Sequence, residues 1–201
     1  VGRGLLDSSL GSRAMEIANR LGELPLNDDE LFEIIDAEPR AVSERVSAMR
    51  ALVSRAKSGV RGPVFDASVD RGLASGDASV RIAARDLQLE LDPGRGLSSL
   101  LVSVESGRTL EERKHAWVRL GDLDHPSARD VLTQGLVYWQ SNELEDAVAL
   151  EVIESAKAQS GGLGVLAERA MVLDPPADAA GLVSARRWAL AGGDSEAGQR
   201  I

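Results

Sequence analysis

The feature that most constrains this chain is an apolar pattern that recurs at nearly constant spacing. Each instance has a small residue, an apolar residue beside it and a third apolar residue three positions further on. The instances begin at Ala14, Ala48, Ala83, Ala116 and Ala149. Their starts lie 34, 35, 33 and 33 residues apart, which is the length of two helices and their turns in a repeat protein. The spacing predicts five helix-turn-helix repeats.

A second apolar stretch with helical spacing follows each instance of the first pattern or lies between two of them. These stretches begin at Leu31, Val64, Leu97, Val131 and Leu163. No segment alternates strictly between apolar and polar residues, as a half-buried strand does. We therefore expect an all-α fold, an α-α superhelix of about five repeats, closed by a C-terminal helix over residues 177–191.

Helix-capping residues stand where this division places helix ends. Thr109 and Glu112 have the spacing of a capping box, in which each side chain bonds the main chain of the other. Asp92 precedes a proline, and a proline is favoured at the first position of a helix. Asn27 and Asn142 each precede a group of acidic residues, which a helix N-terminus stabilises. We expect helices to begin just after all four positions.

The composition excludes several classes of protein. The 201 residues contain no cysteine, which excludes a disulfide framework, a thiolate zinc site, a cysteine nucleophile and covalently attached haem within this segment. The formal net charge of −9 disfavours non-specific binding to nucleic acid. No apolar run approaches the roughly 20 residues that span a bilayer. The chain begins with Val1, so we expect it to be processed or cut from a longer protein.

One segment of the third repeat resembles a known repeat family. Residues 77–84 read Asp-Ala-Ser-Val-Arg-Ile-Ala-Ala, which is similar to the HEAT repeat signature of an Asp in the turn, Val-Arg, and then an inner Ala. The resemblance implies a HEAT/armadillo-like solenoid in which Asp77 and Arg81 tie neighbouring repeats together. The other four repeats match this family mainly in their apolar spacing.

The C-terminal residues carry a second resemblance. Residues 188–201 read Trp-Ala-Leu-Ala-Gly-Gly-Asp-Ser-Glu-Ala-Gly-Gln-Arg-Ile. This stretch resembles the lead-in to the cytochrome c domain of large bacterial proteins that join a dehydrogenase-like β-propeller, a HEAT-like helical region and a haem-binding module. The resemblance implies a HEAT-like solenoid over residues 1–191, and a linker or the start of an absent cytochrome c-like domain over residues 192–201. It also implies a periplasmic or otherwise exported protein.

The residues that carry catalytic chemistry elsewhere form no such constellation here. The two histidines, His115 and His125, lack the spacing of a zinc site such as HExxH. The glycines at 161, 162 and 164 lack the lysine and the preceding strand of a phosphate-binding loop. No nucleophile elbow surrounds a serine, and adjacent carboxylates are explained by helix caps. We expect no enzymatic activity and no catalytic, metal or cofactor-binding residue in this segment.

The residues that could contact a partner are arginines of the second and third repeats and a pair of aromatic residues. Basic residues gather between Arg45 and Arg85, and an exposed aromatic side chain on a solenoid can anchor a partner. Trp117 falls in a core position of the repeat and is expected to be buried. The candidate docking residues are Arg45, Arg50, Arg81, Arg85, Tyr138 and Trp139.

These observations predict a non-catalytic scaffold or spacer. It would dock other domains of the same parent chain or another protein, as a fragment of a larger haem-containing, dehydrogenase-like protein. No nucleic acid and no membrane span is expected. The alternative hypothesis is a nucleic-acid-binding solenoid that uses the basic cluster from Arg45 to Arg85.

Overall fold

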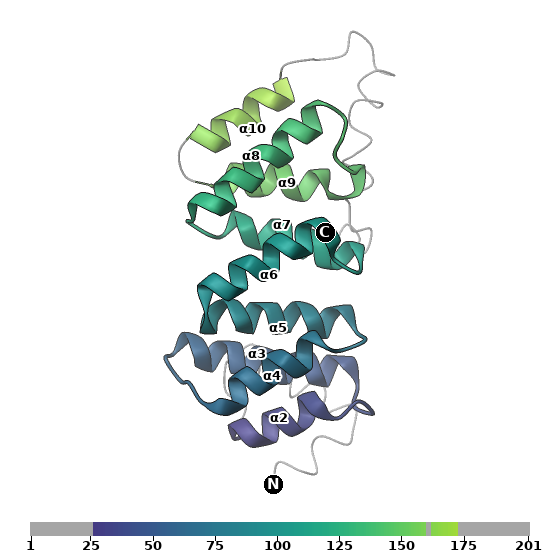
Figure 1. The fold of residues 1–201 in the computed structure, drawn as a ribbon, viewed down its shortest axis with the longest axis vertical. Coiled ribbons are helices and arrows are strands. Elements are labelled where there is room, and N and C mark those ends of the chain that lie inside the picture. The colour runs from purple at the N-terminus through teal and green to yellow at the C-terminus, as the bar shows by residue number, and fades with distance from the viewer. Residues whose placement is uncertain (1–25, 160–161, 173–201) are drawn as a thin grey trace, which may run out of the picture. The chain divides into compact units, whose positions relative to one another are not determined.

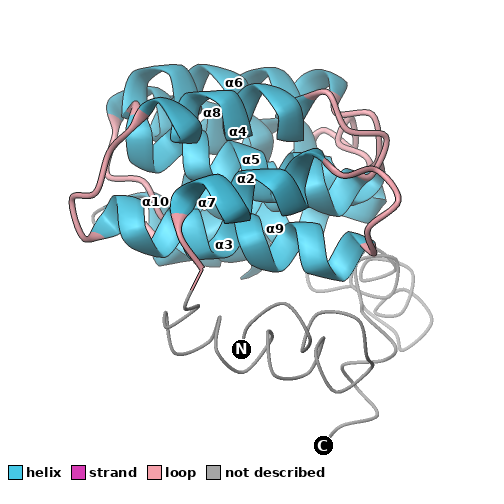
Figure 2. Cartoon of the chain, turned by 90° about the horizontal axis from the view of Figure 1, so that it is seen from below, coloured by secondary structure: helices cyan, strands magenta, loops and turns pink. Residues whose placement is uncertain are grey.

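A computed structural model describes residues 26–159 and 162–172 of the chain. Within these residues the chain forms nine helices and no strand (Figure 2). The helices are α2 (Asp28–Asp36), α3 (Val42–Lys57), α4 (Pro63–Leu73), α5 (Ala78–Leu91), α6 (Pro93–Ser106), α7 (Leu110–Gly121), α8 (Pro126–Gln140), α9 (Asp146–Ala158) and α10 (Gly162–Val172). The helices pack in neighbouring pairs, so the predicted all-α, helical-repeat fold class is confirmed for this part of the chain.

The chain divides into two compact units between Ser99 and Leu100, a position inside α6. Unit 1 holds α2 to α5 and the first half of α6, and unit 2 holds the rest of α6 and α7 to α10. Each unit has its own arrangement of packed helices.

In unit 1, α3 packs beside α5, and α2 packs beside α4 (Figure 1). The two pairs are joined face to face, because α2 also packs on α3 and α4 on α5. The core between them is made of aliphatic side chains, Met49 and one aromatic ring, that of Phe65. Gly72 of α4 allows a close approach of α4 to α5, since a Cβ there would lie 2.6 Å from the Cβ of Ala84 on α5.

In unit 2, α7 packs beside α9, and α8 packs against both of them (Figure 1). The helix α10 packs on α8 and α9. The Trp117 ring is buried, as predicted, and lies against Gly135 of α8. A Cβ at Gly135 would lie 3.0 Å from Cη2 of Trp117 and 2.9 Å from Cγ1 of Val152. A glycine therefore makes room for the largest side chain of this core.

The apolar pattern predicted from the sequence coincides with the cores of both units. The four described instances lie on α3, α5, α7 and α9, and the second stretches lie on α2, α4, α6, α8 and α10. Most residues of the pattern are buried, but Leu166 is 50% exposed. Six more are half-buried: Val64, Leu73, Leu101, Val104, Val131 and Leu150. In α10, the predicted Leu163 is buried, together with Ala167. The first instance and the predicted C-terminal helix and linker lie outside the described residues.

Three of the four predicted helix starts are confirmed. Asn27 and Thr109 form capping boxes with the glutamates three residues later, and Asp92 accepts a hydrogen bond from the main-chain nitrogen of Arg95. The prediction for Asn142 is wrong. The next helix begins at Asp146, and Asn142 adopts a left-handed conformation with φ of 57° in the turn after α8. Asparagine tolerates both a helix N-cap and a left-handed turn, so the residue type alone does not separate the two.

No described helix combines the length and the apolar character that a membrane crossing requires.

Candidate docking surface

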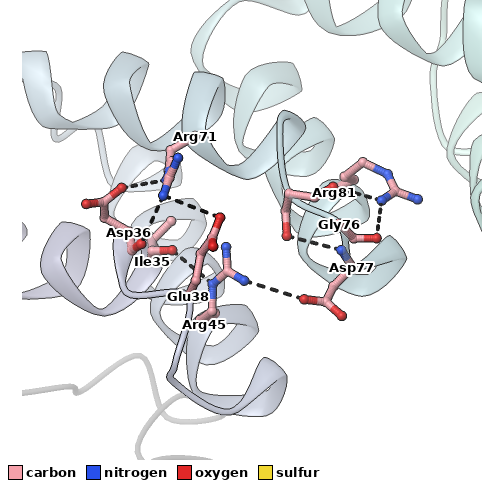
Figure 3. A network of polar contacts seen from close by, with 9 residues as sticks. Ile35, Asp36, Glu38, Arg45, Arg71, Gly76, Asp77 and Arg81 are labelled. Carbon is pink, nitrogen blue, oxygen red and sulfur yellow. Dashed lines mark hydrogen bonds and ion pairs between the residues drawn. The ribbon is translucent and has the colours of Figure 1, made fainter.

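Arg45 lies in the interior of unit 1. It is the fourth residue after Ala41, the N-cap of α3, and its side chain is 5% exposed. Its Nε donates to the main-chain oxygen of Ile35 at 2.9 Å, near the end of α2. Its Nη1 lies 3.4 Å from Oδ2 of Asp77, the N-cap of α5 (Figure 3). One guanidinium group therefore connects three helices.

Arg81 occupies the corresponding position on α5, four residues after Asp77. It is also buried, and its Nη1 donates to the main-chain oxygens of Ser75 at 2.9 Å and of Gly76 at 2.7 Å (Figure 3). These carbonyl groups belong to the turn between α4 and α5. Arg81 thus satisfies acceptors that the end of a helical hairpin would otherwise leave without donors.

Arg113 repeats the arrangement in unit 2, four residues after Thr109, the N-cap of α7. Its Nη1 donates to the main-chain oxygen of Gly107 at 3.5 Å. Its Nη2 lies 2.8 Å and 3.1 Å from the two carboxylate oxygens of Glu145, the N-cap of α9. We call Arg45, Arg81 and Arg113 the arginine links.

The arginine links correct the predicted docking surface. Arg45 and Arg81 are 4% and 3% exposed, so neither can meet a partner without being pulled from its carbonyl acceptors. Sequence reasoning did not single out Arg113. The signal was the recurrence of arginine at the fourth residue after the N-caps of α3, α5 and α7.

The other basic residues of the predicted cluster differ in exposure and in their partners. Arg50 is exposed on α3, and Arg85 is half-buried on α5. Arg55 pairs with Asp28 and with the main-chain oxygen of Leu26. Lys57 and Arg61 both reach Glu90, the first through its carboxylate at 3.6 Å and the second through its main-chain oxygen at 2.8 Å.

A further arginine of unit 1 connects neighbouring helices in the same way. Nε of Arg71, on α4, lies 2.5 Å from Oδ1 of Asp36, at the end of α2 (Figure 3). Its Nη2 donates to the main-chain oxygen of Asp36 at 3.3 Å and lies 3.6 Å from Oε1 of Glu38. In unit 1, arginine side chains therefore serve largely as connections between packed helices.

The aromatic pair of α8 is divided between the surface and the interior. Tyr138 is 44% exposed, and Trp139 is half-buried. Successive helical residues point in different directions, and Tyr138 is the more exposed of the two candidates. Val137, next to it, is 48% exposed.

The turn after α8 fixes the position of Tyr138. The main-chain nitrogens of Glu143 and Leu144 donate to the oxygen of Tyr138 at 2.8 Å and 3.1 Å, and that of Asn142 donates to Trp139 at 3.1 Å. With Asn142 left-handed, this is the Schellman motif that ends many helices. Such motifs often add an apolar contact between the residues at the positions of Tyr138 and Glu143. Here the second residue is a glutamate, so the motif itself supplies no apolar partner for the tyrosine ring.

Large exposed apolar side chains are concentrated in unit 2. Of the eight in the described residues, six lie in unit 2 and two in unit 1. Those of unit 2 are Val102, Val118, Val137, Tyr138, Val165 and Leu166. Isolated apolar residues are normal on a protein surface, but adjacent pairs on one helix are candidates for contact with a partner.

The described histidines and glycines that were weighed as metal or phosphate ligands lie at the ends of helices or within them. His125 is the N-cap of α8, where its Nδ1 accepts from the main-chain nitrogen of Ser127 at 3.2 Å. His115 lies within α7. Gly162 and Gly164 lie in the first turn of α10, and Gly161 is outside the described residues. The described part contains no group of three or more histidine or carboxylate side chains placed to hold a metal ion.

Gln159 is a second structural residue that sequence reasoning missed. It is buried at the end of α9, and its Nε2 donates to the main-chain oxygens of Gly121 at 2.7 Å and Leu123 at 3.0 Å. Its Nε2 also lies 3.2 Å from the oxygen of Leu120, and its Oε1 accepts from Nε of Arg129 at 3.4 Å. The amide therefore caps α7 from α9. No local sequence pattern marks a contact between residues so far apart in the chain.

Comparison with known proteins gives no match: no family model fits the chain, and no curated protein or solved structure is significantly similar to it.

Proposed function

We propose that this chain is a non-catalytic helical-repeat scaffold that docks another protein or another domain of its own parent chain. The observation that carries the proposal is the use of its buried charged groups. Arg45 and Arg81 bind main-chain oxygens, and the buried Glu112 completes a helix cap. A catalytic site instead directs such groups towards a space that a substrate can enter. Here each of them stabilises the packing or the ends of helices.

The docking part of the proposal is supported by the exposed residues. Tyr138 combines a large apolar ring with a hydroxyl group, which is the character of residues that contribute most to protein interfaces. Its main chain is held by the turn, so little backbone conformational entropy would be lost when a partner binds. Of the six candidate docking residues, Tyr138 and Arg50 are the two that present exposed side chains.

The wider context rests on the resemblances to HEAT repeats and to the lead-in of a cytochrome c domain. In this proposal the chain is part of an exported or periplasmic, haem-containing dehydrogenase-like protein, and the solenoid holds a catalytic propeller and a haem domain at a set separation. The haem would lie in a following domain and not in this segment. Determining the gene sequence beyond the codon for Ile201 tests this context, because a Cys-x-x-Cys-His motif is expected soon after it, and a long reading frame without one would refute it.

The scaffold role is tested by binding. The 201-residue chain is titrated, by calorimetry, with the separately purified domains that flank it in the parent protein. We expect saturable binding to at least one of them, with no turnover of a panel of sugar and nucleotide substrates. Absence of binding to every flanking domain, together with saturable binding of a metal ion or nucleotide, would refute the scaffold.

The alternative of a nucleic-acid-binding solenoid depends on the basic cluster from Arg45 to Arg85. Non-specific binding requires clustered, accessible positive charge, whereas Arg45 and Arg81 are buried and Arg55 pairs with Asp28. A gel-shift titration at low salt tests the alternative, and a shift that Arg50→Ala abolishes would favour it over the scaffold.

A further inference from the structure

One face of α8 is exposed along its length and carries charged, polar and apolar side chains. Asp130, Gln134, Val137 and Tyr138 follow one another at the spacing of a single helical face, and all four are exposed. Glu143 lies in the turn just beyond. We call these five residues the α8 face.

The apolar side chains of the α8 face lie outside the buried core. Val137 and Tyr138 are 48% and 44% exposed, whereas the core side of the same helix is formed by Leu132 and Leu136. The turn that follows also provides no apolar cover, because Glu143 stands where such motifs often place an apolar residue. An exposed Val-Tyr pair at the end of a helix is therefore available to another molecule.

The charges around this pair indicate what that molecule carries. Asp130 and Glu143 are exposed, and neither forms an ion pair with a described residue. The neighbouring cation, Arg129, is already paired with Asp124. The uncompensated charge of the α8 face is thus negative, which favours a cationic partner and opposes association with a second copy of the same face.

We propose that the α8 face binds a protein segment with apolar side chains flanked by lysine or arginine. The apolar side chains of that segment would cover Val137 and Tyr138, and its cations would pair with Asp130 and Glu143. This inference rests on the proposed scaffold function and specifies the surface and the partner's chemistry.

The test uses the whole 201-residue chain and two synthetic amphipathic peptides with the same leucine positions, one with lysine and one with glutamate at the polar positions. Binding is followed by fluorescence anisotropy of the labelled peptide. We expect the Leu-Lys peptide to bind and the Leu-Glu peptide not to bind. Tyr138→Ala is expected to lower the affinity for the Leu-Lys peptide by about tenfold, as for an aromatic residue at the centre of an interface. The double substitution Asp130→Asn with Glu143→Gln is expected to weaken it severalfold.

Matched controls separate this face from general acidity and from other exposed apolar residues. Val165→Ser with Leu166→Ser removes a second exposed apolar pair, on α10, and Asp66→Asn with Asp70→Asn removes two exposed carboxylates of α4. Both controls should leave peptide affinity unchanged. Equal affinity for the two peptides, no binding of either, or a loss as large in the controls would overturn the inference. The scaffold function would survive each of these results, because it is tested with the flanking domains.

Discussion

In unit 1 the arginine link from α3 to α5 is buried, whereas in unit 2 the corresponding link from α7 to α9 lies close to the surface. The Arg45 side chain is 5% exposed and its best hydrogen bond goes to a main-chain oxygen at 2.9 Å. The Arg113 side chain is 26% exposed, its main-chain contact is 3.5 Å long, and its best contact is a two-oxygen ion pair with Glu145.

This difference shows that arginines at the same position of two repeats can stabilise the fold through different interactions. A buried guanidinium stabilises the fold by donating hydrogen bonds to acceptors that water does not reach, and its removal leaves those acceptors unsatisfied. An exposed ion pair competes with water and salt, so its net contribution is small. The two units therefore share the position of the arginine link but differ in how much it contributes to stability. The following substitutions measure that difference.

The largest effect is expected from Arg45→Ala. It leaves the oxygen of Ile35 without its donor and removes a buried side chain, so we expect a loss of about 3 kcal/mol in unfolding free energy. Arg113→Ala should cost about 1 kcal/mol or less. Urea denaturation followed by circular dichroism measures both, with Arg50→Ala as the exposed control. Equal losses at Arg45 and Arg113 would contradict the comparison.

A slightly smaller loss is expected from Gly121→Ala in unit 2. The new Cβ would lie 2.7 Å from the Cβ and 2.9 Å from the Cα of Ser155, so α7 and α9 must separate. We expect a cost of about 2 kcal/mol, net of the gain in helix propensity. Gly94→Ala, whose nearest neighbour would be 3.4 Å away, is the control and should not destabilise. Thermal unfolding checks both, and unchanged stability of Gly121→Ala would show that the helices can shift freely.

Gln159→Ala tests a contact that has no counterpart in unit 1. In unit 1 the residue after α5 is Asp92, which caps the next helix instead. Loss of the Gln159 amide leaves carbonyl groups at the end of α7 without donors, for an expected cost of about 1.5 kcal/mol. Gln134→Ala, at an exposed position of α8, should change stability by less than about 0.5 kcal/mol. The hydrogen-exchange rates of the α7 amides should rise in Gln159→Ala and stay unchanged in Gln134→Ala.

The smallest effects are expected at the two capping boxes. Thr109→Ala removes an acceptor for the main-chain nitrogen of Glu112 and a donor to its buried carboxylate, so we expect a loss of about 1 kcal/mol. Asn27→Ala should cost somewhat less, because the Glu30 side chain remains partly in water. Circular dichroism melting of the two variants gives the order, and Asn27→Gly, which keeps a favourable cap residue, serves as a milder control. A reversed order would show that burial does not strengthen the cap.

The fold was predictable because its signals are local. Apolar spacing places the core residues of α3, α5 and α7 correctly, and the capping boxes mark the starts of α2 and α7 within a few residues. Local signals fail where one residue type fits two conformations, as at Asn142. They also fail at Leu166, because apolar spacing does not say which apolar residues of a helix face its neighbours.

The candidate surface was predictable only in part. Arg45 and Arg50 are close in sequence, but they point to opposite sides of α3, so one is buried and the other exposed. The partner of Arg45, Asp77, lies 32 residues away, and a density of basic residues contains no information about such a contact. Tyr138 could be proposed because adjacent helical residues cannot both be buried easily, although the choice between it and Trp139 required the structure.

The constant position of the arginine links also bears on how such a chain could lengthen. Each arginine is the fourth residue after its own N-cap. Arg45 and Arg113 reach the N-caps of α5 and α9. Arg81 and Arg113 also bind the turn before their own helix, and Arg45 binds Ile35 near the end of the preceding helix. A duplicated segment that contains one whole hairpin would carry both halves of this contact. A cut inside a hairpin would separate the arginine from its main-chain acceptors in the preceding helix or turn. Gene duplication and protein engineering would therefore succeed most readily when the exchanged module begins and ends between an arginine-bearing helix and the helix that follows it.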